Sequence, residues 1–580
     1  MLQKFFFVLT ALFLASLLAF RNAERQSANR EFVKQESVKR TVIRCSPDWD
    51  AMQIWLDESD IPPIPGAGKH RWTISTKNDS AQFYFNQGIN MYYSFHLIEA
   101  MASFKKAARF DPGCAMLYWA QALGYGPNIN DYGYRASPEA LASVKESLER
   151  VAAASPMEQA LINAMSVRYT ADSADATRES LNNEYTEKMR KVYEEYSGHP
   201  DVQALYADAM MLQHPWDLWQ GDGTPRPWTP RIREVLEKLI AQYPEHPGGN
   251  HFYIHVMEPS PFAEKALPSA EILGKSNPGL SHVVHMPSHI YLRTGYYQKG
   301  VNVNTDALSS YQKTLPLYAP VAGNDFLYVI HNLHMKTNNA MMTGNYEISR
   351  KAAQETRASI PTEYLSIPPP MGNAVQYVYM TPVLVYVRFG KWDELLMISA
   401  PGDSLIYARI LYHFGRGMAF SGKTKLAEAR LELASLQELM KDTSLVIPLT
   451  PFSPSIEGAI VAENILIGTI ALKEKKYRDA IPAFEEAAVT EENMVYSEPR
   501  DWMLNPKHYM GNALLQAGRA REAREIFEKD LLNNKENGWA LYGVWQALKK
   551  ERNPAAAARY LARFRTAFRG ADIQISNAVY

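Results

Sequence analysis

Histidines are concentrated in one stretch of this chain, and their spacing would bring them together. Eight of the 14 histidines lie between residues 246 and 335, where even spacing along 580 residues would place about two. His251 and His255 are four residues apart, and so are His285 and His289, so each pair shares one face if the segment is helical. Neutral imidazole is the commonest protein ligand for zinc and copper. The stretch therefore predicts a metal site.

The two pairs are also separated by a constant interval of 34 residues, which is the period of a helix-pair repeat. Residues one period apart lie above one another on neighbouring units, so the pairs are expected to meet, with Glu258 on the same face. Such a donor set suits Zn, Cu, Ni or Fe better than Ca or Mg. A further pair on the next unit would complete a second site. The predicted metal ligands are His251, His255, Glu258, His285, His289, His331 and His334.

The chemistry of such a site stays open at the level of sequence. HFYIH lacks the Glu that follows the first His in metalloprotease helices. Glu258 or Tyr253 can serve as an acid or base, so a metal-dependent hydrolase and an oxidoreductase are both alternatives. Two readings without a metal also remain: a ladder of His, Asn and Tyr hydrogen bonds between repeats, and a non-catalytic groove that binds a protein or peptide partner.

Composition excludes one class of partner. The chain has 61 basic and 62 acidic residues, a net charge of −1 and no basic stripe. Because phosphate binding requires clustered Lys and Arg, nucleic acid is not expected to bind.

Residues 1–25 predict an export signal or an N-terminal anchor. Lys4 precedes an apolar run from Phe5 to Phe20, which is short for a membrane span. We expect a periplasmic or outer-surface protein, with membrane contact only through an uncleaved N-terminus. The cleavage site is not clear from the sequence. The two cysteines, Cys45 and Cys114, can either form a disulfide or remain unpaired thiols.

The rest of the chain divides into four predicted regions. Residues 26–75 read as an extended lead-in, 76–245 as helical repeats, 246–345 as the His-rich units and 346–580 as further repeats. Several repeats keep a common register of small, small, aromatic and small residues, in which the small residues let two helices approach closely. The clearest examples are Gly88, Ala100, Phe104 and Ala107, and Gly468, Ala480, Phe484 and Ala487.

Across residues 76 to 570 this register resembles that of tetratricopeptide-repeat proteins. The segments HPGGNHFYIHVMEPS, HVVHMPSHIYLRTGYY and HNLH look more narrowly like those of a bacterial, often exported family of such repeat proteins, for which no activity is established. The general resemblance implies an all-α solenoid, a right-handed superhelix of helix pairs with a concave groove, and usually a protein or peptide partner. It also implies that the histidines line the groove, since they fall at the groove-lining positions of each unit's first helix.

One residue departs from this pattern. Pro287 lies between His285 and His289, and if it begins a helix, then His282 and His285 lie on the preceding turn.

Overall fold

The structure is a computed structural model that describes residues 49–580, except 132–133, 173, 322–325 and 499–501. Within this part, the chain is helical throughout, and its only β-type pairing is an isolated bridge between Trp219 and Pro225. The predicted export signal and Cys45 lie outside the described residues.

The helices follow one another as antiparallel neighbours. Those of the first half are α2 (Trp49–Glu58), α3 (Asp79–Tyr92), α4 (Leu97–Phe110), α5 (Ala115–Gly124), α6 (Pro138–Glu149), α7 (Pro156–Met165), α8 (Arg178–Glu195), α9 (Pro200–Gln213), α10 (Thr229–Gln242), α11 (Pro247–Met257), α12 (Leu267–Ser276), α13 (Ser281–His285), α14 (Pro287–Thr294) and α15 (Tyr297–Thr314). Those of the second half are α16 (His331–Met342), α17 (Tyr346–Ser359), α18 (Met371–Tyr379), α19 (Thr381–Arg388), α20 (Trp392–Leu396), α21 (Ile406–Gly422), α22 (Leu426–Leu439), α23 (Ser455–Lys473), α24 (Tyr477–Asn493), α25 (Pro506–Gln516), α26 (Ala520–Asn533), α27 (Gly538–Lys550) and α28 (Pro554–Ala567).

The pairing of these helices follows from the small-residue register. A Cβ placed on Gly88 of α3 would lie 2.4 Å from Phe104 of α4, so only glycine lets that ring enter between the two helices. The same contact recurs in the α23/α24 pair, where a Cβ on Gly468 would lie 2.6 Å from Phe484. The predicted fold class, an all-α solenoid of the tetratricopeptide type, is confirmed.

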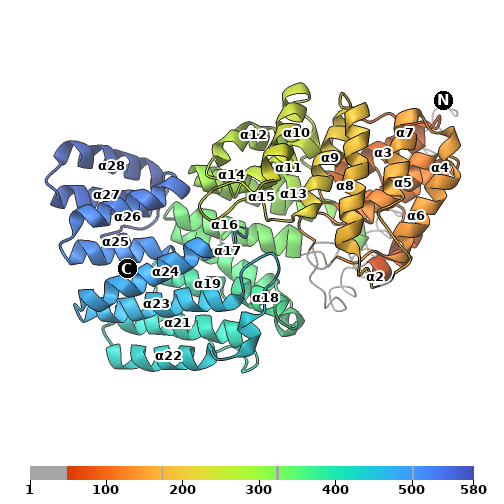
Figure 1. Ribbon diagram of the computed structural model, residues 1–580. Helices are drawn as coiled ribbons and strands as arrows, with labels where there is room; N and C mark the ends of the chain where they lie inside the picture. Colours follow the sequence, from red (N-terminus) through yellow and green to blue (C-terminus); the bar gives the residue numbers. More distant parts are fainter. Residues whose placement is uncertain (1–48, 132–133, 173, 322–325, 499–501) are drawn as a thin grey trace, which may run out of the picture.

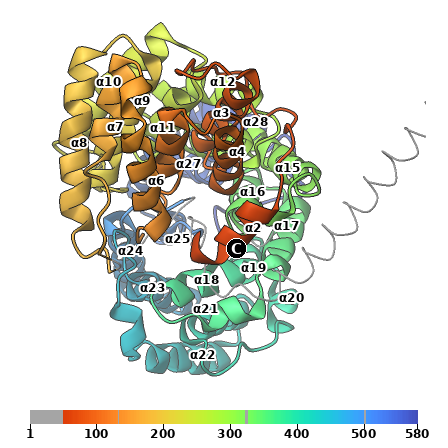
Figure 2. The same cartoon turned by 90° about the vertical axis from the view of Figure 1, so that its right-hand side faces the viewer.

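The helix pairs follow one another around a superhelix. In Figure 1 the first half of the chain occupies one side of the molecule and the second half the other, with α16 and α17 between them. Figure 2 shows successive pairs arranged around a ring. The apolar core divides at the same place: one cluster extends from Trp49 to Tyr328, and the other from Met341 to Val579.

The predicted lead-in is only partly extended. Residues Trp49–Glu58 form helix α2. Trp49 packs edge-on against Tyr125, so the contact with the end of α5 holds this helix against the core. The irregular segment that follows is held by polar side chains of α3; for example, the amide N of Trp72 donates to Asn86 Oδ1 over 3.0 Å. It also reaches the loop between α12 and α13, where the amide N of Gly279 donates to the carbonyl of Gly66 over 3.0 Å.

One helix in the described part of the chain, α23, has the length and apolar composition of a membrane span. More than half of its apolar window is buried, since it packs between α21, α24 and α25. We therefore describe α23 as a core helix of the second half.

Candidate metal centre

Four short helical segments position the predicted ligands. Helix α11 carries His251 and His255, and Glu258 occupies its C-cap. Pro287 does begin a separate helix, α14, which carries His289, and the preceding α13 carries His282 and His285. Helix α16 begins at His331. The alternative that the sequence left conditional on Pro287 is thus the arrangement observed.

Three histidines form a first triad, namely His251, His255 and His282. The Nε2 atom of His251 lies 3.1 Å from Nε2 of His255 and 3.1 Å from Nε2 of His282. Ligand nitrogens about 2.0–2.1 Å from one metal ion are themselves about 3 Å apart, so this spacing suits a shared ion. All three side chains are fully buried.

The outer ring nitrogens of two members of this triad, His251 and His255, contact other groups. His251 Nδ1 lies 2.7 Å from the carbonyl oxygen of Tyr93 and must donate to it, because a carbonyl only accepts. His251 Nε2 then carries no proton in the neutral ring, and its single lone pair faces Nε2 of His255 and Nε2 of His282. A proton shared between two rings can form a hydrogen bond either between His251 and His255 or between His251 and His282. A metal ion bound to all three nitrogens would satisfy each of them. His255 Nδ1 likewise lies 3.1 Å from Glu258 Oε1, an arrangement typical of metal-binding histidines.

A second triad, made of His285, His289 and His331, lies beside the first. Its ring centroids are 4.9 to 5.5 Å apart, and the ring of His285 is 5.0 Å from that of His282. Neither nitrogen of His285 has a hydrogen-bond partner among the described residues, and the same holds for Nε2 of His289 and of His331. Buried polar atoms normally have partners, so these nitrogens are exceptions that require an explanation.

Two carboxylates lie between the triads. Glu258 contacts both, with Oε1 3.1 Å from His255 Nδ1 and Oε2 2.8 Å from His289 Nδ1. Glu498, from the second half of the chain, lies 3.5 Å from His255 Nδ1 and 3.6 Å from His289 Nδ1. Tyr496 donates to Glu258 Oε2 over 2.7 Å. The centre is therefore built from both halves of the solenoid.

Burial and charge divide these histidines into two classes. Burial lowers the pKa of four imidazoles well below the usual value, so they are neutral at pH 7 and offer lone pairs: His251, His282, His285 and His331. Burial acts in the same direction on His255 and His289, but the adjacent carboxylates outweigh it. They raise the pKa of His255 to about 9 and also raise that of His289. The pKa of Glu258 is lowered despite its burial, because both imidazoles stabilise its charge.

Two aromatic side chains cover the first triad. The Phe95 ring lies 4.5 Å from the His251 ring and stacks on His282 at 5.4 Å, while Trp216 meets His255 edge-on at 5.4 Å. Both residues have positive φ angles, 54° and 60°. Bulky residues rarely adopt this conformation, which costs about 1–3 kcal/mol and is concentrated at functional sites. The aromatic cover lowers the polarity around the triad.

The structure differs from the sequence interpretation in where the histidines lie. They are enclosed between helices and do not line an open groove: His251, His255 and Glu258 have no exposed surface. The reason is the segment between α3 and α4, whose Phe95 covers them. His334 lies apart from both triads, with Nε2 3.2 Å from the Met503 sulfur, and burial lowers its pKa to about 4.

A third group of His and Asp residues is close enough for a metal but has the wrong protonation. His70 Nε2 lies 2.8 Å from Asp201 Oδ1, and His246 Nε2 lies 3.4 Å from the same atom. However, His246 Nδ1 accepts a hydrogen bond from the amide of Gly249. Its proton must then be on Nε2, where it points to Asp201. This group is a hydrogen-bonded support under Tyr93, whose hydroxyl also donates to Asp201 over 2.9 Å.

Sequence reasoning missed four contributors to the centre: His282 as a member of the first triad, Phe95, Tyr496 and Glu498. His282 carried a signal, since it falls at a groove-lining position of the repeat. Glu498 and Tyr496 carried none, because they lie outside the His-rich units and far along the chain from Glu258, which is 238 residues before Tyr496.

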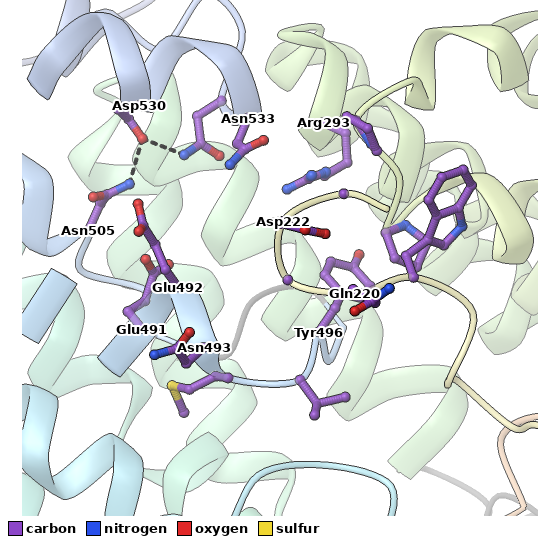
Figure 3. A pocket seen from close by; sticks show the side chains of 18 of the residues that line it. Gln220, Asp222, Arg293, Glu491, Glu492, Asn493, Tyr496, Asn505, Asp530 and Asn533 are labelled. Atoms are coloured by element: carbon purple, nitrogen blue, oxygen red, sulfur yellow. Dashed lines mark hydrogen bonds between the residues drawn. The ribbon is translucent and has the colours of Figure 1, made fainter. Parts of the chain in front are cut away.

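A cavity of about 390 Å³ approaches the centre from the side of Tyr496. It lies between the loop around Gly221, the end of α24, the start of α25 and the end of α26. Figure 3 shows Glu491, Glu492 and Asp530 on one side of it and Arg293 on the other, with Tyr496 beside Arg293. Tyr496 thus contacts the cavity and also hydrogen-bonds Glu258 within the centre.

Comparison with known proteins adds little beyond the fold. No family model and no curated protein matches the chain. Solved structures that are similar at 12% identity include a human IFIT1 dimer with m7Gppp-AAAA, which covers 85% of this chain and 91% of that one with a TM-score of 0.29. The match to yeast Tom70 covers 83% of this chain and 92% of Tom70, with a TM-score of 0.31. The match to the APC/C hetero-tetramer Cut9-Hcn1 covers 71% of this chain and 94% of that one, with a TM-score of 0.24. No conclusion about ligands or partners follows from similarities of this size.

Proposed function

We propose that this protein binds a transition metal ion in its His-rich centre, with His251, His255 and His282 as the first ligands. The observation that carries the proposal is the single lone pair of His251 Nε2, which faces two ring nitrogens at 3.1 Å each. An all-imidazole set of this kind suits Zn, Cu, Fe or Ni. Three protein ligands leave a coordination position for a substrate or water, as catalytic sites require.

Metal-assisted hydrolysis and oxidation are the two chemistries that fit this donor set. A bound metal ion would supply Lewis acidity or redox capacity. The protein's own contribution would be to exclude water with Phe95 and Trp216 and to orient His255 and His289 through Glu258 and Glu498. The hydroxyl of Tyr496 lies where the cavity meets Glu258, so it is placed to pass a proton between the two.

The setting of this function is also a proposal. The charged and apolar pattern of residues 1–25 and the resemblance to exported bacterial repeat proteins favour a periplasmic or outer-surface location, with an N-terminal anchor if the signal stays uncleaved. The alternative function is a scaffold without chemistry, in which the solenoid binds a protein or peptide partner.

Elemental analysis of the protein, purified without an affinity His tag or added metal, tests the proposal. We expect near-stoichiometric Zn, Cu, Fe or Ni in the wild type and a loss of that metal in the His251→Ala/His282→Ala variant. The His413→Ala variant is a matched control, because His413 pairs with Glu432 away from the centre. A protein that carries no metal and takes up none of these four ions would contradict the proposal and favour the scaffold.

A further inference from the structure

We propose that the second triad, His285, His289 and His331, holds a second metal ion next to the first, so that the centre is binuclear. This inference rests on the proposed metal binding but adds a separate site with separate ligands. Its basis is the set of buried ring nitrogens that have no hydrogen-bond partner in the part of the chain that the structure describes.

The first argument is the cost of leaving these nitrogens without partners. His285 and His289 are fully buried, yet both nitrogens of His285 and Nε2 of His289 have no hydrogen-bond partner among the described residues. A buried polar atom without a partner costs about 1–3 kcal/mol. A neutral imidazole has one lone pair, so a single cation can bind one nitrogen of each ring. A cation bound by one nitrogen of His285 and by Nε2 of His289 and of His331 would remove this cost for three buried atoms.

The second argument is that the two triads have similar dimensions, with two of the three ring separations nearly equal. The rings of the second triad are 4.9, 4.9 and 5.5 Å apart, and those of the first are 4.8, 4.9 and 6.4 Å apart. The second triad comes from α14, the end of α13 and the start of α16, whereas two members of the first come from α11. The chain therefore builds two comparable three-imidazole sets, which share α13 and otherwise come from different helices.

The third argument is the placement of negative charge. Glu258 reaches one triad through Oε1 and the other through Oε2, so it orients a histidine of each. Glu498 lies at 3.5 and 3.6 Å from the same two histidines and 3.8 Å from Nε2 of His331. The two carboxylates at the boundary between the triads together carry two negative charges, and each lies close to a histidine of both triads. This arrangement suits two ions that share their charge compensation.

The stoichiometry of Zn²⁺ tests the inference on the full chain. After dialysis against excess Zn²⁺ and desalting, we expect two ions per chain in the wild type. We expect one in His285→Ala, one in His282→Ala and none in the variant with both changes. His331→Ala provides a second route to the same loss, and because the side chain is 13% exposed it is the milder change for folding. His413→Ala should retain two, and circular dichroism checks that each variant is folded.

A second readout reports on the distance between the sites. Loading with Cu²⁺ should give a weakened paramagnetic resonance signal in the wild type, because two neighbouring ions couple, and a full single-ion signal in either single variant. One ion in the wild type, unchanged in His285→Ala, would overturn this inference and leave the proposed single site standing. No ion in the wild type would overturn both.

Discussion

At the scale of single residues, hydrogen bonds to the outer ring nitrogens decide which histidines can bind a metal. His251 donates from Nδ1 to a carbonyl, so its Nε2 carries a lone pair that faces the triad. His246 accepts at Nδ1 from Gly249, so its Nε2 carries a proton that faces Asp201. Both residues are buried and both lie beside other histidines, yet they have opposite roles. Proximity of ligand atoms alone does not distinguish them.

Asp201 provides a test of this distinction. We expect Asp201→Asn to lower the free energy of unfolding by about 3 kcal/mol, because it leaves buried donors of His70 and Tyr93 poorly matched, and to leave the metal content unchanged. Urea unfolding and elemental analysis measure the two effects. The exposed Asp403, paired with Arg409, is the control, and Asp403→Asn should change stability by less than about 0.5 kcal/mol. Loss of metal in Asp201→Asn would show that this group belongs to the centre.

The same carboxylate predicts a dependence on pH. Burial raises the pKa of Asp201, but hydrogen bonds from His246 and His70 outweigh it, so the folded-state pKa is lowered below its usual value. A lowered folded-state pKa contributes stability above the unfolded-state value of about 4 and loses it as the pH falls towards the folded-state pKa. The stability difference between the wild type and Asp201→Asn should therefore shrink when unfolding is measured at pH 3 instead of pH 7. A difference that grows at pH 3 would reverse this sign.

At the scale of helices, the sequence predicted contacts within a repeat well and contacts between repeats poorly. Gly88 and Phe104 belong to one unit, and their register gave the observed contact. The 34-residue interval predicted His255 beside His289, and both do contact Glu258. It also predicted His251 beside His285, but the helix break at Pro287 moves α13 so that His282 meets His251 instead. A period describes regular units, and the site lies where a unit is broken.

The glycine register makes a prediction for helix pairs. Gly468→Ala should lower the free energy of unfolding by about 1–3 kcal/mol, because its Cβ would lie 2.6 Å from the Phe484 ring and force α23 and α24 apart. Chemical denaturation measures this change. Gly402→Ala is the matched control, since nothing lies within 4 Å of its Cβ, and we expect a change below about 0.5 kcal/mol. Equal effects of the two substitutions would contradict the packing argument.

At the scale of the whole molecule, the centre joins parts of the chain that a simple solenoid would keep independent. In a repeat array each unit contacts only its neighbours, so its stability is nearly local. Here Tyr496 and Glu498 reach back to Glu258 and its histidines. Nearby, the ammonium group of Lys535 pairs with Glu264 over 2.8 Å. The backbone carbonyl of Lys535 accepts a hydrogen bond from the Tyr297 hydroxyl. The centre is thus lined by residues from both halves of the chain.

Metal binding should consequently stabilise both halves together. A ligand that binds only the folded site adds about 2.7 kcal/mol at 100 times its dissociation constant, and this gain falls on every element that must be ordered to form the site. On addition of Zn²⁺, we expect slower amide hydrogen exchange in α11, α13 and α14 and also in residues 494–498. The α21/α22 hairpin contributes no ligand and should change least. The His282→Ala/His285→Ala variant should show no metal-dependent change. Protection confined to α11, α13 and α14 would mean that the second half takes no part in the centre, and that Glu498 only lies beside it.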